Sequence, residues 1–181
     1  MQTAPGTSLS ELPSGRPRAR DRLLGVLISM AVVVYVLDQL TKGLAVRDLR
    51  PGASMPLLGS FVQLRLVRNA GAAFSLATGM TWLLTLVAVI VVLVIVRSAR
   101  RLGSRGWALA LGLLLGGAVG NLTDRLVRPP GIGRGQVVDF IDYGGLFVGN
   151  VADVAIVTAA VLIAALSLRG IGLDGGRARN G

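Results

Sequence analysis

The sequence contains no cysteine and no histidine. Their absence excludes a thiol nucleophile, a Ser–His or Cys–His catalytic pair, a disulfide, and a metal site built on imidazole or thiolate ligands. Acidic residues are also few, nine among 181, and the one glutamate, Glu11, lies in a polar N-terminal stretch. Proton-transfer chemistry must therefore come from aspartate, lysine, tyrosine or water, and the aspartates are the main candidates.

Hydrophobic residues make up 52% of the chain and charged residues only 15%, with a mean hydropathy of +0.68. A soluble domain of this size could not bury so much apolar surface, and the apolar residues come in long runs, which indicates an integral membrane protein. The formal net charge of +10 would also suit nucleic acid. No soluble segment remains to carry a basic face, so we expect no nucleic-acid partner.

Four apolar segments predict four transmembrane helices in a mainly α, integral membrane fold. Their expected bounds are Leu23 to about Val46, Met80–Val96, Trp107–Leu122 and Val151–Leu168. Residues 1–22 are rich in Pro, Ser, Gly and Arg, a composition that predicts a disordered tail. Residues 23–168 then form one membrane domain, and residues 169–181 form a C-terminal tail.

Basic residues are distributed unevenly between the two ends of these helices. Eleven of the 19 lysines and arginines lie in the N-terminal tail, between the second and third spans, or in the C-terminal tail. The positive-inside rule then places both termini in the cytoplasm. The aspartates near the other span ends consequently share the outer face, and they are Asp38, Asp124, Asp139, Asp142 and Asp153.

The connections on the outer face predict a small extracytoplasmic β-sheet. The stretch FVQLRL at 61–66 alternates apolar and polar residues, as a half-buried strand does. The stretch QVVDFI at 136–141 is rich in β-branched and aromatic residues, which favour strands. We expect these two segments to form a cradle of sheet and loops over the membrane domain.

Asp139 and Asp153 are the strongest candidates for chemistry. Asp153 lies in the first turn of the fourth span, where a carboxylate is either functional or simply stabilises the helix N-terminus. Asp139 lies in an apolar, strand-like run, although it could be a surface carboxylate of that strand. Two buried carboxyls close together can share one proton, so that one activates water while the other protonates the scissile carbonyl. Such hydrolysis uses neither a metal nor another cofactor.

Other polar residues at this face have structural interpretations. Asn150 suits a helix N-cap, and Asp142, which is followed by Tyr143 and two glycines, suits a turn. Asp38 and Lys42 are four residues apart, hence on one helix face, and can form an ion pair.

The third span carries a glycine at every fourth position from Gly112 to Gly120, a spacing that lets helices approach closely. Asp124 continues this stripe and, with Arg125, suggests a charge pair at the helix end, with packing as the alternative. The stretch RNAGAAFS at 68–75 either brings the backbone close to a ligand or begins the second helix.

Five short motifs follow one another along the chain. They are DQLTK at 38–42, NAGAAF at 69–74, GNLTDR at 120–125, VVDF at 137–140 and NVAD at 150–153. In this order, and on four spans, they resemble lipoprotein signal peptidase, also called signal peptidase II, a family of membrane aspartyl proteases. The resemblance covers roughly residues 22–168.

The resemblance implies that Asp139 and Asp153 form the catalytic pair and that no metal or cofactor takes part. The residues implied to line the site and position the substrate are Asn69, Asn121, Arg125 and Asn150. Those implied to support it are Asp38, Lys42 and Asp124.

The implied substrate is a bacterial prolipoprotein with a diacylglyceryl group on its cysteine, cut immediately before that cysteine. We then expect a monomer in the bacterial cytoplasmic membrane, surrounded by lipid, with its active site at the outer face. Two features depart from the family pattern. Gly149 stands where the family usually has phenylalanine, and VRPPGIGRG after Leu126 lengthens the connection to Asp139. Both departures concern the shape of the substrate groove.

Two other functions fit parts of the sequence. Acids in spans also mark ion paths in transporters and channels, but such a path needs polar residues at several depths, and these acids cluster at one face. The glycine stripe could also be the partner surface of a non-catalytic membrane assembly subunit. Cleavage of a lipid-modified precursor would distinguish a peptidase from both.

Overall fold

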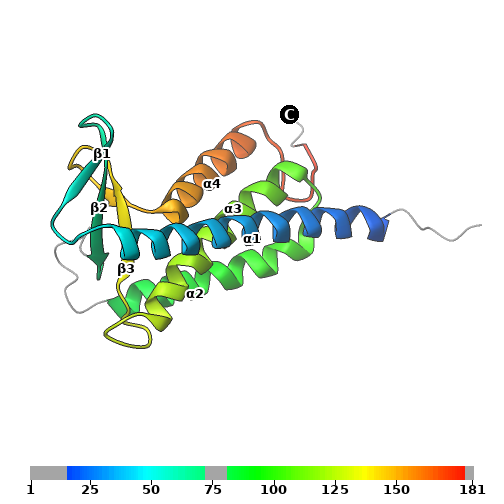
Figure 1. Cartoon of the computed structure of the whole chain (residues 1–181). Helices are drawn as coiled ribbons and strands as arrows, with labels where there is room; N and C mark the ends of the chain where they lie inside the picture. The colour runs from blue at the N-terminus through cyan, green and yellow to red at the C-terminus, as the bar shows by residue number, and fades with distance from the viewer. Residues whose placement is uncertain (1–15, 72–80, 178–181) are drawn as a thin grey trace, which may run out of the picture.

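The computed structural model describes residues 16–71 and 81–177 (Figure 1). Four helices are long and apolar enough to cross a membrane, namely α1 (Arg16–Asp48), α2 (Thr81–Ser98), α3 (Arg105–Val127) and α4 (Val151–Leu168). The predicted four-helix membrane fold is therefore confirmed. A short 3-10 helix, Ala99–Arg101, continues α2.

Helix α1 begins earlier than expected. It starts at Arg16, so the predicted disorder of residues 1–22 is wrong for residues 16–22, while residues 1–15 lie outside the described residues. Pro17 occupies the first turn, where the missing N–H would have no helical partner anyway, and the arginines and alanine that follow favour helix. The polar composition of this segment therefore did not prevent helix formation.

Helix α3 is longer than expected, because it continues past Leu122 to Val127. The added turn carries Asp124, whose side chain is fully buried between α1 and the sheet. Its polar residues contact protein rather than lipid, so hydropathy alone ended the helix too early. The bounds of α4 are those predicted, and the predicted start of the second span at Met80 lies outside the described residues.

Four antiparallel strands form one sheet in the order β1–β2–β3–β4. They are β1 (Ser54–Leu58), β2 (Val62–Asn69), β3 (Val137–Asp142) and β4 (Val148–Gly149). The two predicted strand segments correspond to β2 and β3, which confirms the small sheet. The sequence did not predict β1, which is exposed along its whole length, or β4, which has only two residues.

The sheet lies at the end of the bundle away from the N-terminus of α1 (Figure 1). Strand β3 contacts both α1 and α3, and Val138 is fully buried. The β2–β3 register pairs Val67 with Asp139 and Asn69 with Val137. This register holds the side chains of Asn69 and Asp139 above the ends of the helices.

Helix α3 contacts each of the other three helices and has glycines on two faces. A Cβ atom on Gly116 would lie 2.6 Å from the carbonyl oxygen of Ala31 in α1. A Cβ atom on Gly117 would lie 2.6 Å from the carbonyl oxygen of Ala152 in α4. The predicted close approach at the stripe from Gly112 to Gly120 is confirmed, and Gly117 permits a second one that the spacing did not indicate.

Gly116→Val is expected to destabilise the bundle by about 1–3 kcal/mol, because the added methyl groups would overlap the α1 backbone. Gly43→Ala is the matched control, since its added Cβ would have no atom of the described residues within 4 Å apart from the adjoining part of α1. Replacing glycine by alanine in a helix is worth up to about 1 kcal/mol, so the control should be neutral or stabilised. Thermal unfolding in detergent micelles measures both variants. Equal melting temperatures would contradict the tight α1–α3 contact.

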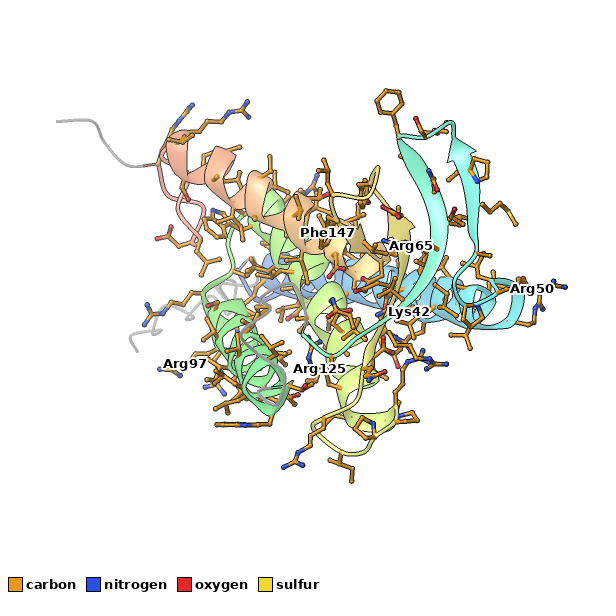
Figure 2. All side chains as sticks on the ribbon, turned by 90° about the vertical axis from the view of Figure 1, so that its left-hand side faces the viewer. Lys42, Arg50, Arg65, Arg97, Arg125 and Phe147 are labelled. Atoms are coloured by element: carbon orange, nitrogen blue, oxygen red, sulfur yellow. The ribbon has the colours of Figure 1, made fainter. Side chains whose placement is uncertain are left out.

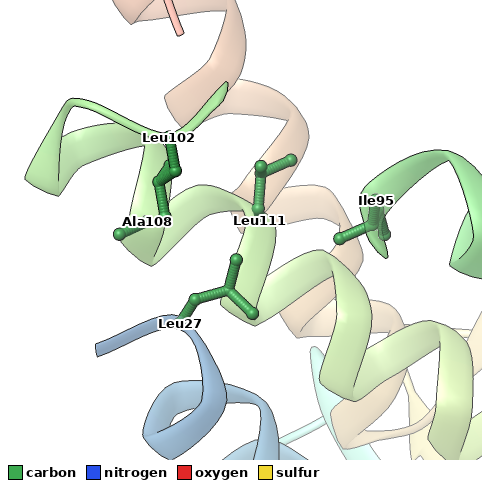
Figure 3. Packing of buried hydrophobic residues seen from close by; sticks show 5 residues of the cluster. All are labelled: Leu27, Ile95, Leu102, Ala108 and Leu111. Carbon is green, nitrogen blue, oxygen red and sulfur yellow. The ribbon is translucent and has the colours of Figure 1, made fainter. Parts of the chain in front are cut away.

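An apolar cluster lies at the end of the bundle opposite the sheet. Its members are Leu27, Ile95, Leu102, Ala108 and Leu111 (Figure 3). Leu173, after α4, packs against this cluster. The Trp107 indole N–H donates to the carbonyl oxygen of Ile171 over 2.8 Å, and the Gly103 N–H donates to that of Leu173 over 2.9 Å. The described part of the C-terminal tail is therefore docked on the helices.

Candidate functional site

Asp139 and Asp153, predicted from separate motifs, converge beside Asn150. Asp139 belongs to β3 and is almost fully buried, and Asp153 belongs to the first turn of α4. The Asn150 Nδ2 donates to Asp139 Oδ1 over 2.6 Å. The Asn150 Oδ1 accepts from the backbone N–H of Asp153 over 2.9 Å. The predicted N-cap role of Asn150 is confirmed, and the same side chain links the two acids.

All four carboxylate oxygens of this pair accept a hydrogen bond. Besides the bond from Asn150, Asp139 accepts at Oδ2 from Asn69 Nδ2 over 2.8 Å. Asp153 accepts at Oδ1 from Asn121 Nδ2 over 2.9 Å and at Oδ2 from the Asn150 backbone N–H over 3.1 Å. Three asparagines, from β2, α3 and the start of α4, therefore fix the orientation of both carboxyl groups.

Burial raises the pKa of Asp139 from 3.8 to about 6. Hydrogen bonds from Asn69 and Asn150 act in the opposite direction, and the charge of Asp153 raises the pKa further. A carboxyl group with this pKa binds and releases a proton close to neutral pH, which is the range useful for general acid–base catalysis.

Lys42 is fully buried and uses all three of its N–H donors. Its Nζ lies 2.8 Å from Asp38 Oδ2 and 3.0 Å from Asp124 Oδ2, and it donates to Asn121 Oδ1 over 2.9 Å. The predicted Asp38–Lys42 ion pair is confirmed. Because Lys42 donates to the oxygen of Asn121, the amide nitrogen of Asn121 is directed to Asp153.

Asp124 pairs with Lys42 and with Arg128 Nε, which lies 2.6 Å from its Oδ1. It also accepts from the backbone N–H of Val138 over 3.1 Å, which ties α3 to β3. The suggested Asp124–Arg125 pair is therefore wrong, because Arg128, one turn later, takes that position. The spacing of four residues between Asp124 and Arg128 could have indicated this contact.

Arg125 instead points its guanidinium back along α3, where Nη1 donates to the carbonyl oxygen of Asn121 over 3.4 Å. Its charge interacts with those of Asp139 and Asp153. Its buried Nε atom has no hydrogen-bond partner within the part of the chain that the structure describes. Arg125 thus retains an unused donor near the two acids.

Asp142 has a separate role from Asp139, although both belong to β3. Its Oδ1 accepts from the Gly145 N–H over 2.7 Å, which confirms the predicted turn role. Its Oδ2 lies 2.9 Å from Arg65 Nε, an ion pair that the sequence did not indicate. Neither of these contacts reaches Asp153 or Asn150.

Two hollows open beside the pair of acids. One has a volume of about 370 Å³ and lies over the sheet, where Arg65, Arg68, Asn69 and Asp139 line it. The other has a volume of about 360 Å³ and lies along α4, where Asp153, Val154 and Val157 line it with Tyr143. Phe147 lines both hollows. Figure 2 shows Lys42, Arg65, Arg125 and Phe147 grouped toward the middle of the molecule, with Arg50 and Arg97 at its periphery.

Comparison with known proteins gives consistent results. The model of the Peptidase_A8 family, described as signal peptidase (SPase) II, matches residues 30–169. A lipoprotein signal peptidase of Rhodococcus jostii (strain RHA1) is 54% identical over 169 residues, covering 91% of this chain and 85% of that protein. One of Leifsonia xyli subsp. xyli (strain CTCB07) is 46% identical over 181 residues, covering 98% and 84%.

The fold also resembles a solved structure described as a bacterial membrane enzyme determined by the in meso method at 1.9 Å resolution. The two share 28% sequence identity with a TM-score of 0.71, over 80% of this chain and 94% of that one.

Proposed function

The chain belongs to the signal peptidase II family, and we propose that it cuts a bacterial prolipoprotein immediately before its diacylglyceryl-modified cysteine, with Asp139 and Asp153 as the proton-transferring groups. The observation that carries this assignment is the junction at Asn150. Its side chain and backbone bind both carboxyl groups, and Asn69 and Asn121 bind the remaining carboxylate oxygens. A pair of carboxyls held in this way can share one proton.

The reaction then proceeds without a covalent intermediate. The ionised carboxylate takes a proton from a water molecule as the water oxygen attacks the scissile carbonyl carbon, while the protonated carboxyl donates its proton to the carbonyl oxygen. When the C–N bond breaks, the nitrogen receives the proton first taken from water, and one hydroxyl of the tetrahedral intermediate returns its proton to the other carboxylate, which restores the shared proton. The products are the signal peptide with a new carboxylate and a lipid-modified cysteine with a new amino group.

The supporting residues act by position. Lys42 holds the Asn121 amide, which in turn holds Asp153, and Asp38 and Asp124 form ion pairs with the buried Lys42. Arg125, whose charge interacts with those of Asp139 and Asp153, positions the substrate backbone at this pair of acids.

We place the protein in the bacterial cytoplasmic membrane, as a lipid-surrounded monomer with cytoplasmic termini and its site at the outer face. Eleven of the 19 lysines and arginines lie in the sequence before the first span, between the second and third spans, or after the fourth span, and they support this orientation under the positive-inside rule. A bond next to a lipid anchor lies near the membrane surface, where the sheet covers the helix ends (Figure 1).

Cleavage of a purified, diacylglyceryl-modified prolipoprotein tests this function. The expected result is a gel shift that yields the signal peptide and the lipid-modified product, unchanged by a chelator. If the purified protein never cleaves the modified precursor in detergent or in lipid vesicles, the peptidase assignment is wrong, and a transport or assembly function must be tested instead.

The pH dependence of cleavage should reflect Asp139. Its pKa of about 6 means that the shared proton is present below pH 6 and is lost as the pH rises through that value. Loss of the proton leaves two negative carboxylates and no acid for the carbonyl oxygen, so kcat/KM should fall by about tenfold per pH unit above the pKa. Initial rates between pH 5 and 8 measure this, and a rate that rises steadily to pH 8 would contradict the shared proton.

A further inference from the structure

Phe147 occupies an unusual position between the two hollows. The residue is 48% exposed, and its ring stacks on that of Tyr143, with ring centroids 6.0 Å apart and an interplanar angle of 17°. The Tyr143 N–H donates to the carbonyl oxygen of Phe147 over 2.8 Å, which closes the β3–β4 turn and fixes the backbone below the ring. The ring is therefore held in place by a turn and by an aromatic neighbour.

Gly149 explains how the ring reaches this position. A Cβ atom on Gly149 would lie 2.7 Å from Phe147 Cε1 and 3.1 Å from Asp153 Oδ2. The ring thus covers Gly149 and lies close to Asp153. Residues two apart on an extended strand project from the same face. Phe147 therefore takes the space that a side chain at position 149, where the family usually has phenylalanine, would fill.

The hollows on the two sides of this ring differ in chemistry. The hollow along α4 is lined by Val154 and Val157, which are exposed on the surface of this apolar helix. The hollow over the sheet is lined by two arginines. Arg65 is neutralised by Asp142, whereas the Arg68 guanidinium is exposed and forms no ion pair with any residue in 16–71 or 81–177.

We propose that Phe147 is a specificity-determining residue, whose ring separates the membrane-embedded part of the substrate from the residues that follow the lipid-modified cysteine. This inference rests on the proposed function. Those following residues enter the hollow over the sheet, where Arg68 favours an acidic side chain over a basic one. The hollow along α4, on the other side of the ring, takes the part of the substrate that stays in the bilayer.

The first test moves the aromatic ring from position 147 to position 149. Phe147→Ala should lower kcat/KM by about 10–100-fold, the range for loss of a large apolar contact in a substrate pocket. Gly149→Phe alone should also lower it, because two rings would compete for one space. The double variant Phe147→Gly/Gly149→Phe should recover most of the loss, because one ring again fills that space. Wild-type activity in Phe147→Ala, or no recovery in a well-folded double variant, would overturn the proposal.

The second test varies charge in the substrate. Prolipoproteins with aspartate or lysine directly after the cysteine should differ in kcat/KM by about threefold or more in favour of aspartate, as expected for an exposed ion pair. Arg68→Glu should reverse this preference. Arg50→Glu is the matched control, because it makes the same charge change at an exposed position far from Phe147 (Figure 2) and should leave the preference unchanged.

A wild-type protein that cleaves both substrates equally would overturn the inference and leave the proposed function standing. A wild-type protein that cleaves neither would overturn both.

Discussion

Asp139→Asn and Asp153→Asn should each reduce cleavage of the modified prolipoprotein by about 10³-fold or more, the upper range for removal of a general acid or base. Each substitution keeps the size of the side chain but removes an ionisable group. An amide can neither take a proton from water nor hold the shared proton, so the pair cannot perform both transfers. Neither variant should recover activity at any pH between 5 and 8.

The measurement is single-turnover cleavage by purified protein, with folding checked by thermal unfolding in detergent. Asp142→Asn is the matched control because Asp142 is a buried acid in the same strand and an asparagine oxygen can still accept the Gly145 N–H. This control should stay within about tenfold of wild type, since it removes no proton-transferring group. If Asp139→Asn cleaves like the control, Asp139 is not part of the pair, and Asp124 becomes the next candidate.

Lys42→Gln should be the most destabilising single substitution near the site, with a loss of about 3–5 kcal/mol. Lys42 and Arg128 balance the charges of Asp38 and Asp124, and the side chains of Lys42 and both acids are fully buried. Removing Lys42 leaves one uncompensated negative charge in this cluster. It also removes the donor that orients Asn121 toward Asp153, so activity should fall with stability.

The double variant Asp38→Asn/Lys42→Gln provides the internal control. It is again neutral, since Asp124 keeps Arg128 as its partner, and it should recover about half or more of the lost unfolding free energy. Denaturant or thermal unfolding of the wild type, the two single variants and the double variant completes the cycle. Additive losses would contradict the charge-balanced cluster.

Local rules were sufficient for much of the architecture. The apolar runs predicted four spans, and the bounds of α4 were correct, because a helix that meets lipid must be apolar along its length. Alternation and β-branched residues located β2 and β3. Hydropathy ended α3 too early, at Leu122. The polar residues beyond that point remain helical because they contact α1 and β3 rather than lipid.

The sequence by itself determined that this is a membrane protein and that its candidate catalytic aspartates lie at one end of its helices. Hydropathy defines the spans and basic residues define their orientation, and both can be read from residues that are neighbours along the chain. Only the tertiary structure decided which groups meet. Residues 69, 121, 139 and 150 come from separate elements and are joined by hydrogen bonds whose partners lie 11 to 70 positions apart. Spacing rules cannot specify such contacts. The position of Phe147 over Gly149 also depends on the tertiary structure. The shape of the β3–β4 turn places the ring beside Asp153, and the identity of the residue alone could not have predicted this.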